Sequence, residues 1–388
     1  MPTALAASKI ATKIVARGPS LIPVAIVRTS PAPPRRVGWF TRARRDNPPA
    51  CMHRARRRVE SALCVGGRVS LDVRVAVLGA RGSIGSAVVR RARLAGHQVR
   101  AVVRPSSGTE RFPAGTEVVH ADLYAKESVI EAARGVDVVV HAANVPYPDW
   151  PRLVPRLAEN ALAAAEAAGA TLAFPGNVYV YGRPQTRPAT EDHPQAPQTQ
   201  KGRLRVAVER TFLQAHRDGR IRLVLPRYPD FYGPGVMHEL YRPIFEGALA
   251  GGRCRWPLDA DAPHEFILID DAAEAMLTLI RTPAAHGRAV HVPGPRPITP
   301  REFIRLVYAA AGSHEPRVRV FGRGSFRLVG LFNPLARSAY EMGYLFDDPV
   351  LLDGSLYRQL TGGPYPATPY EEGVRRTVDW FRSHRTTS

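Results

Sequence analysis

The glycine-rich stretch Val73–Gly85 constrains this chain most, because an apolar, β-branched run ends there in three spaced glycines before a helical pattern begins. Gly79 allows a tight turn, Gly82 allows a phosphate-bearing ligand to approach the main chain, and Gly85 allows a helix to pack close to the strand. A strand, a glycine turn and a helix N-terminus together form an anion site. The stretch therefore predicts dinucleotide binding, with a purely structural turn as the alternative.

Two arginines indicate which dinucleotide is bound. The second expected strand, Gln98–Arg104, ends in arginine, whereas an acidic residue at this point would bind the ribose 2′-hydroxyl. Arg104, together with Arg81 in the glycine turn, offers forked hydrogen bonds that suit a 2′-phosphate. The sequence predicts NADP, with NAD as the second choice. Two ordinary solvent-facing arginines are the alternative.

Strand and helix patterns alternate from residue 73 to residue 226, with two helices expected at about residues 153–168 and 201–216, and parallel strands need such helical crossovers. The pattern predicts an α/β fold, with a Rossmann-type doubly wound parallel sheet in a dinucleotide-binding domain at residues 71–228. The pattern then becomes mixed, which predicts a smaller mixed α/β C-terminal substrate lobe at residues 229–388, with a final helix and some segments that return to the core. The loop after the fourth strand carries Tyr147 and Trp150 at the carboxyl edge of the sheet, where ligands bind.

Residues 1–70 form a basic leader, with 14 Lys and Arg against 2 Asp and Glu, out of a net charge of +20 for the whole chain. The leader is rich in proline and arginine, so we expect it to be disordered. Its composition resembles a transit peptide, and an over-long gene model is the alternative. Three cysteines form no disulfide framework, which favours a cytoplasmic setting.

Composition and motifs also indicate which classes of partner the chain binds. No nucleic-acid motif accompanies the basic charge, no metal-ligand spacing occurs, and no apolar run is long enough for a membrane span. We expect a small-molecule substrate, no nucleic acid, no metal and no stable membrane insertion.

From residue 73 to residue 384 the chain resembles the extended short-chain dehydrogenases/reductases, in the NAD-dependent epimerase/dehydratase family. The matching motifs are Gly79, Gly82 and Gly85 in GxxGxxG, Asp122-Leu123, Val180-Tyr181-Gly182, Arg227 with Phe231–Gly235, and His264–Ala275. Within the Arg227 segment, Asp230 stands where the family usually has asparagine. The resemblance implies a hydride-transferring enzyme that acts on a small molecule such as a nucleotide sugar, with a homodimer as a family habit.

Two sets of binding residues follow from the glycine turn, the loop positions and the resemblance. The cofactor set is Gly79, Arg81, Gly82, Ser83, Ile84, Gly85, Arg104, Asp122, Leu123, Ala142, Ala143 and Arg205. The substrate set is Tyr147, Trp150, Arg227, Tyr232 and His264.

The catalytic signature of the family is altered in this chain. Asn177 stands where the family has Ser or Thr, while Lys201 and Arg205 stand where it has the Tyr and Lys of Tyr-x-x-x-Lys. Asn177 can still donate a hydrogen bond to an oxyanion, and Lys201 could act as an acid if its pKa were lowered. Tyr179 and Tyr181 are further proton donors, and on a strand they would share one face.

Two functions are compatible with this altered set. The first is an NAD(P)-dependent oxidoreductase or epimerase/isomerase with atypical acid/base residues. The second is a catalytically weak NAD(P)-binding sensor or scaffold.

Overall fold

The structure is a computed structural model that describes residues 73–106, 112–322, 324 and 340–384. The leader at residues 1–70 lies outside the described residues. All of the described residues belong to one unit, at residues 49–388.

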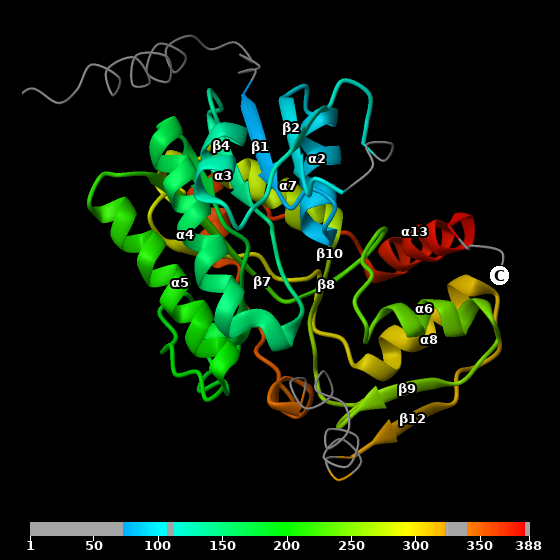
Figure 1. Ribbon diagram of the computed structural model, residues 1–388. Coiled ribbons are helices and arrows are strands. Elements are labelled where there is room, and N and C mark those ends of the chain that lie inside the picture. The colour runs from blue at the N-terminus through cyan, green and yellow to red at the C-terminus, as the bar shows by residue number, and fades with distance from the viewer. Residues whose placement is uncertain (1–72, 107–111, 323, 325–339, 385–388) are drawn as a thin grey trace, which may run out of the picture. The chain divides into compact units, whose positions relative to one another are not determined.

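A parallel sheet forms the centre of this unit (Figure 1). Its strand order is β11-β7-β5-β4-β1-β2-β3, and β6 pairs with β7. The strands are β1 (Arg74–Leu78), β2 (Gln98–Val103), β3 (Glu117–His120), β4 (Val138–His141), β5 (Thr171–Ala173), β6 (Gly176–Asn177), β7 (Arg222–Tyr228) and β11 (Ala289–His291). The central strands are apolar because helices cover both of their faces. The predicted doubly wound α/β fold is confirmed.

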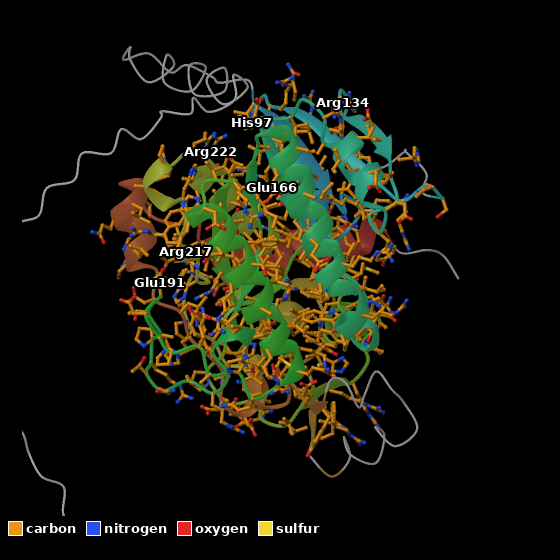
Figure 2. The ribbon with its side chains drawn as sticks, turned by 60° about the vertical axis from the view of Figure 1, so that its left-hand side comes forward. His97, Arg134, Glu166, Glu191, Arg217 and Arg222 are labelled. Atoms are coloured by element: carbon orange, nitrogen blue, oxygen red, sulfur yellow. The ribbon has the colours of Figure 1, made fainter. Side chains whose placement is uncertain are left out.

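Helices cover the two faces of the sheet in two groups, which bury separate apolar clusters. One face carries α2 (Ser83–Leu94) and α7 (Ile269–Ile280). The other carries α3 (Lys126–Ala132), α4 (Trp150–Ala168) and α5 (Gln200–Arg217). Figure 2 brings α4 and α5 to the front, with Glu166 labelled on α4 and Arg217 on α5.

Beyond β7 the chain builds a smaller lobe. Strand β8 (Asp230–Tyr232) pairs with β10 (Phe266–Leu268), and β9 (Cys254–Pro257) pairs with β12 (Val318–Phe321). Helices α6 (Arg242–Leu249), α8 (Pro300–Ala311) and α13 (Tyr370–Ser383) pack together over an aromatic core. The short helices of the described residues are α11 (Tyr344–Asp347), α12 (Ser355–Thr361), η1 (Tyr147–Asp149), η2 (Val178–Val180) and η3 (Pro283–Ala285).

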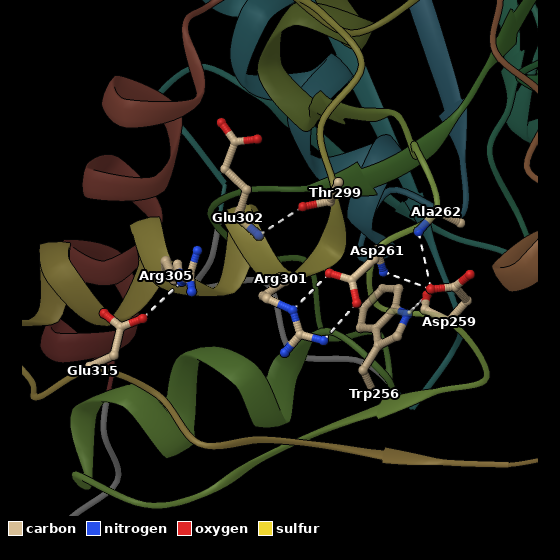
Figure 3. A network of polar contacts seen from close by, with 9 residues as sticks. All are labelled: Trp256, Asp259, Asp261, Ala262, Thr299, Arg301, Glu302, Arg305 and Glu315. Carbon is tan, nitrogen blue, oxygen red and sulfur yellow. Dashed lines mark hydrogen bonds and ion pairs between the residues drawn. The ribbon is translucent and has the colours of Figure 1, made fainter.

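Polar contacts fix α8 in this lobe (Figure 3). Thr299 caps the helix by accepting a hydrogen bond from the Glu302 amide at 3.1 Å. Arg301 donates two hydrogen bonds of 2.7 Å to Asp261, one to each carboxylate oxygen. The helix therefore begins where its capping residue predicts.

Two segments from beyond residue 229 return to the sheet. Helix α7 packs against α2, with ion pairs from Arg90 to Asp270 at 2.8 Å and from Arg91 to Glu274 at 2.7 Å. Strand β11 extends the sheet beside β7. Helix α7 thus completes the helical layer that contains α2, and β11 completes the sheet.

Candidate functional site

A cavity of about 1010 Å³ opens along the carboxyl ends of the parallel strands. Its lining runs from the glycine turn after β1, past the ends of β2 and β4, to β8 and the start of the smaller lobe. Open α/β sheets bind ligands at this edge. The volume lies at the upper end of the range for small-molecule sites, so an extended ligand fits.

The glycine turn leaves main-chain donors facing this cavity. Gly79 has a φ of +81°, and a Cβ there would lie 2.7 Å from the Cα atom of Ala143. A Cβ on Gly85 would lie 2.4 Å from the Gly79 carbonyl oxygen, so α2 packs closely on the turn. Gly82 is the N-cap of α2, and no side chain caps the helix. The first amides of α2 are thus available to an anionic ligand.

The end of β2 carries basic groups and no acidic one. Arg104 is exposed, and it lines the cavity together with Arg81 and Ser106. Asp122, at the end of β3, accepts a hydrogen bond of 2.9 Å from the Tyr124 amide, which shapes the neighbouring wall. This arrangement offers cations where an acidic residue would bind an unmodified ribose.

Arg205 enters the middle of the cavity from α5. Its guanidinium lies 4.7 Å from the Trp150 ring and 5.3 Å from the Phe174 ring, within cation–π distance. Its buried Nε–H group has no hydrogen-bond partner among the described residues. Burial, with the nearby charge of Arg205, lowers the pKa of His141 to about 3. His141 is therefore a neutral group in this wall.

Two tyrosine hydroxyls meet at the far end of the cavity. Tyr147, from the loop after β4, lies with its hydroxyl 2.8 Å from that of Tyr179. Asn177 accepts a hydrogen bond from the Tyr179 amide at 3.2 Å, and all three residues line the cavity. Burial raises the pKa of Tyr179 well above its usual value, and the electrostatic influence of Tyr147 and Asp230 raises it further. Burial also raises the pKa of Tyr147.

The structure brings most of the expected binding residues to this cavity. The expected cofactor and substrate residues in the lining are Gly79, Arg81, Gly82, Ser83, Ile84, Arg104, Asp122, Leu123, Ala142, Ala143, Arg205, Tyr147 and Trp150. Gly85, Arg227, Tyr232 and His264 lie outside the lining. Gly85 instead sets the helix against the turn, and Arg227 pairs with buried Glu209.

Of the four expected catalytic residues, Asn177 and Tyr179 line the cavity, whereas Lys201 and Tyr181 do not. The Lys201 side chain is 4% exposed, and its Nζ lies 2.7 Å from Glu341 and 5.0 Å from the centre of the Tyr147 ring. Tyr181 is buried beside Arg227, to which its hydroxyl is hydrogen-bonded, and His291. Two of the four expected catalytic residues therefore line the cavity, and the other two are buried outside its lining.

The expected strand arrangement of Tyr179 and Tyr181 on one face is wrong. Residues Val178–Val180 form the 3-10 helix η2, which Asn177 caps. A 3-10 helix turns once in about three residues, so positions two apart no longer share a face. Tyr179 consequently faces the cavity while Tyr181 packs in a separate core.

Three cavity residues of the smaller lobe received no role from the sequence. Asp230 accepts hydrogen bonds at Oδ2 from the Tyr241 hydroxyl, at 2.5 Å, and from His264 Nε2, at 2.9 Å. The His238 ring stacks on Tyr241 with 4.9 Å between ring centres. Asp230 was visible in the sequence as the residue in place of an asparagine. The roles of Tyr241 and His238 depend on how the chain turns after β8.

Metal and membrane sites are absent from what the structure describes. Over residues 73–106, 112–322 and 340–384, no group of three or more His, Cys, Asp or Glu side chains is placed to hold a metal ion. None of the helices in the same ranges is long and apolar enough to cross a bilayer.

The sheet order and the glycine turn define a Rossmann-fold protein. The model of the NAD dependent epimerase/dehydratase family matches residues 75–292, and the chain belongs to this family.

Two of the relatives come from Streptomyces. A 3-diazoavenalumate denitrifying reductase is 30% identical over 262 residues, which is 63% of this chain and 84% of that protein. The dTDP-glucose 4,6-dehydratase of Streptomyces antibioticus is 26% identical over 209 residues, so the match spans 53% of this chain and 56% of the dehydratase. Among solved structures, a UDP-glucose 4-epimerase from Thermotoga maritima superposes with a TM-score of 0.66 at 19% identity, covering 80% of this chain and 99% of that one.

Proposed function

We propose that this protein is an NADP-dependent oxidoreductase that transfers hydride between the nicotinamide ring and a small molecule. The observation that carries the proposal is one continuous cavity, which joins the uncapped start of α2 to a pocket rich in aromatic side chains. The pyrophosphate would bind at the amides of Ser83 and Ile84, at the start of α2, and the 2′-phosphate at Arg81 and Arg104. Nicotinamide bound in this cavity supplies the hydride.

The side chains in the middle of the cavity have distinct parts in this proposal. Arg205 stands in the position of the family's lysine, and its unpartnered Nε–H would donate to a ribose hydroxyl. Asn177 and the hydroxyl pair of Tyr147 and Tyr179 would border the substrate. Lys201 would act as a positioning residue beneath the Tyr147 ring, held by Glu341.

Net reduction of a substrate is favoured over epimerisation by the acid/base groups at the cavity. An NAD-dependent epimerisation begins with oxidation of an alcohol, which needs a base to accept the hydroxyl proton, and Lys201 stands at the position of the family tyrosine that would do so. Reduction of an activated acceptor requires less help from such acid/base groups, because the acceptor already takes up hydride readily. A relative that is named a reductase matches 63% of this chain, which also supports the proposal.

The choice between NADP and NAD can be tested at Arg104. Arg104→Ala should weaken NADPH binding roughly tenfold, because one charge-assisted contact to the 2′-phosphate is lost. NADH binding should stay within about twofold, since NADH lacks that phosphate. Titration of both dinucleotides by nicotinamide fluorescence measures the two constants. Arg375→Ala, at an exposed arginine on α13, is the matched control. Equal weakening of both dinucleotides would reject the phosphate assignment.

A sensor or scaffold that binds NADP without turnover is the second candidate. The replacement of the family tyrosine by a buried, ion-paired lysine favours it. Steady consumption of NADPH that depends on an added carbonyl or imine acceptor would exclude this candidate. Tight NADPH binding without consumption by any acceptor would favour it over the oxidoreductase.

A further inference from the structure

One wall of the cavity carries an acidic group that the dinucleotide does not need. Asp230, at the start of β8, lines the cavity with its side chain 26% exposed. Both of the hydrogen bonds that the described residues give to it end on Oδ2. The second oxygen is thus left to meet a ligand. No lysine or arginine of the described residues lies within ion-pair distance of the carboxylate.

The surroundings of Asp230 keep it negatively charged. Burial would raise the pKa of this carboxyl group, but the hydrogen bonds from His264 and Tyr241 outweigh burial and hold the pKa below its usual value. His264 donates its Nε2–H to Asp230, while its buried Nδ1 has no partner among the described residues.

Aromatic side chains surround the same end of the cavity. Tyr147 lies 5.2 Å from Trp150, and Trp150 lies 6.3 Å from Tyr179, between ring centres. Phe231 and Tyr241 also line the cavity. Aromatic faces beside an anion attract an organic cation, because the ring quadrupole and the carboxylate both favour positive charge.

Among the described residues, four titratable groups at this end and in the middle of the cavity are weak proton donors. Burial raises the pKa of Tyr147 and of Tyr179, so both hydroxyls are weak acids. His141 is neutral, since burial lowers its pKa to about 3. Arg205 does not give up its proton. A neutral carbonyl group must gain a proton as it is reduced, whereas an acceptor that is already positively charged need not.

We propose that the substrate is an organic cation in which the electrophilic carbon is double-bonded to a positively charged nitrogen, that is, an iminium ion on an aromatic or apolar skeleton. This inference rests on the proposed oxidoreductase function. Hydride leaves the reduced nicotinamide with its electron pair and forms a C–H bond at the iminium carbon. The π pair of the C=N bond becomes the lone pair of nitrogen. The products are a neutral amine and NADP⁺, and no proton is consumed.

In this proposal the positive charge of Arg205 serves the cofactor, and the negative charge of Asp230 serves the substrate. Arg205 stacks on Trp150 and Phe174, where the proposal places the ribose of the cofactor. Asp230 stands on the lobe side with Tyr241 and His264. A cationic substrate would therefore approach the carboxylate while the phosphates of the cofactor meet the arginines.

The inference can be tested with two probes of similar shape. The cation is N-methyl-dihydroisoquinolinium, which carries its charge at every pH, and the neutral partner is tetralone. The full chain is first titrated with NADPH, and both probes are then offered to the NADPH complex. We expect kcat/KM for the cation to exceed that for the ketone at least about tenfold.

Asp230→Asn tests the residue itself. This change should lower kcat/KM for the cation roughly 10- to 100-fold, mainly through KM, and should leave the Kd of NADPH unchanged. Asp230→Glu keeps the charge and should retain a preference for the cation. Asp379→Asn, at an exposed aspartate on α13, should change nothing. Thermal unfolding of each variant identifies any that fails to fold.

Each result distinguishes the inference from the function on which it rests. Equal or faster reduction of the ketone would overturn the cationic substrate while leaving the oxidoreductase intact. An Asp230→Asn variant that folds and still prefers the cation would overturn the role of Asp230. Binding of NADPH without binding or reduction of the cation would also reject the inference. Failure to bind NADPH at all would instead reject the proposed function.

Discussion

Single residues decide the chemistry of this cavity more than the fold does. Lys201, which the motif spacing assigns to the position of the family tyrosine, forms an ion pair with Glu341 and does not line the cavity, whereas Arg205 does. Asp230 stands where the family usually has asparagine and brings a carboxylate to the lobe side of the cavity. These replacements were readable in the sequence as departures from a motif. Their consequences were not, because each depends on partners distant in the chain, such as the 140 positions between Lys201 and Glu341.

Gly85 gives a prediction at this scale. Gly85→Ala would place a Cβ 2.4 Å from the Gly79 carbonyl oxygen, so α2 must move away from the turn. We expect NADPH binding to weaken at least about tenfold and the free energy of unfolding to fall by about 1–3 kcal/mol. Fluorescence titration and urea unfolding measure the two effects. Gly363→Ala is the control, because no atom lies within 4 Å of the added Cβ. Unchanged binding in Gly85→Ala would contradict the close packing.

Elements were predicted well where one periodic pattern fixed them. The helices expected at residues 153–168 and 201–216 were found as α4 and α5 with small shifts at their ends. The segment at η2 was not foreseen, because its apolar and aromatic residues alternate as a strand does. The Asn177 cap and the turn that follows override this local pattern.

An ion pair between two elements gives the next prediction. Arg227 on β7 donates to Glu209 on α5 from Nε at 3.1 Å and from Nη2 at 2.5 Å, with both side chains at most 2% exposed. Arg227→Met should lower the free energy of unfolding by about 3–5 kcal/mol, because Glu209 is left buried without its partner. Urea unfolding measures the loss.

The double variant separates the cost of an unpaired charge from that of lost packing. Adding Glu209→Leu to Arg227→Met should restore most of the stability, since no buried charge then remains. A single variant that loses less than about 1 kcal/mol would show that water reaches the pair.

At the scale of the whole molecule, the parallel sheet followed from the sequence because each strand–helix unit has its own local pattern. The smaller lobe was less predictable. Its strands are short, and its core joins residues from β8 to α13, which lie far apart along the chain. Burial of Phe266 and Trp256 among other aromatic rings comes from such long-range packing, which no local window contains.

A buried carboxyl group gives a prediction at this scale. Burial raises the pKa of Glu265 from 4.5 to about 8, and its carboxylate accepts a hydrogen bond from the Leu352 amide at 3.0 Å. The folded chain thus keeps a proton that the unfolded chain loses, so stability should fall as pH rises from about 4.5 to about 8.

Glu265→Gln removes this dependence, because an amide does not titrate. At pH values near 8, the variant should be more stable than the unaltered protein by about 3 kcal/mol as an order of magnitude. Near pH 4.5 the two should be similar. Thermal unfolding across this range checks the prediction, and a variant that is less stable at every pH would contradict it.

The position of β11 has a consequence for how the protein is made. This strand forms the edge of the sheet beside β7, yet its residues, Ala289–His291, follow β8, α6, β9, β10 and α7 in the chain. During translation the nascent chain emerges from the ribosome in order, so the sheet stays unfinished until these elements have been synthesised. Early release of the growing polypeptide, at any point before this strand, would leave the backbone N–H and C=O groups along that edge of β7 unpaired.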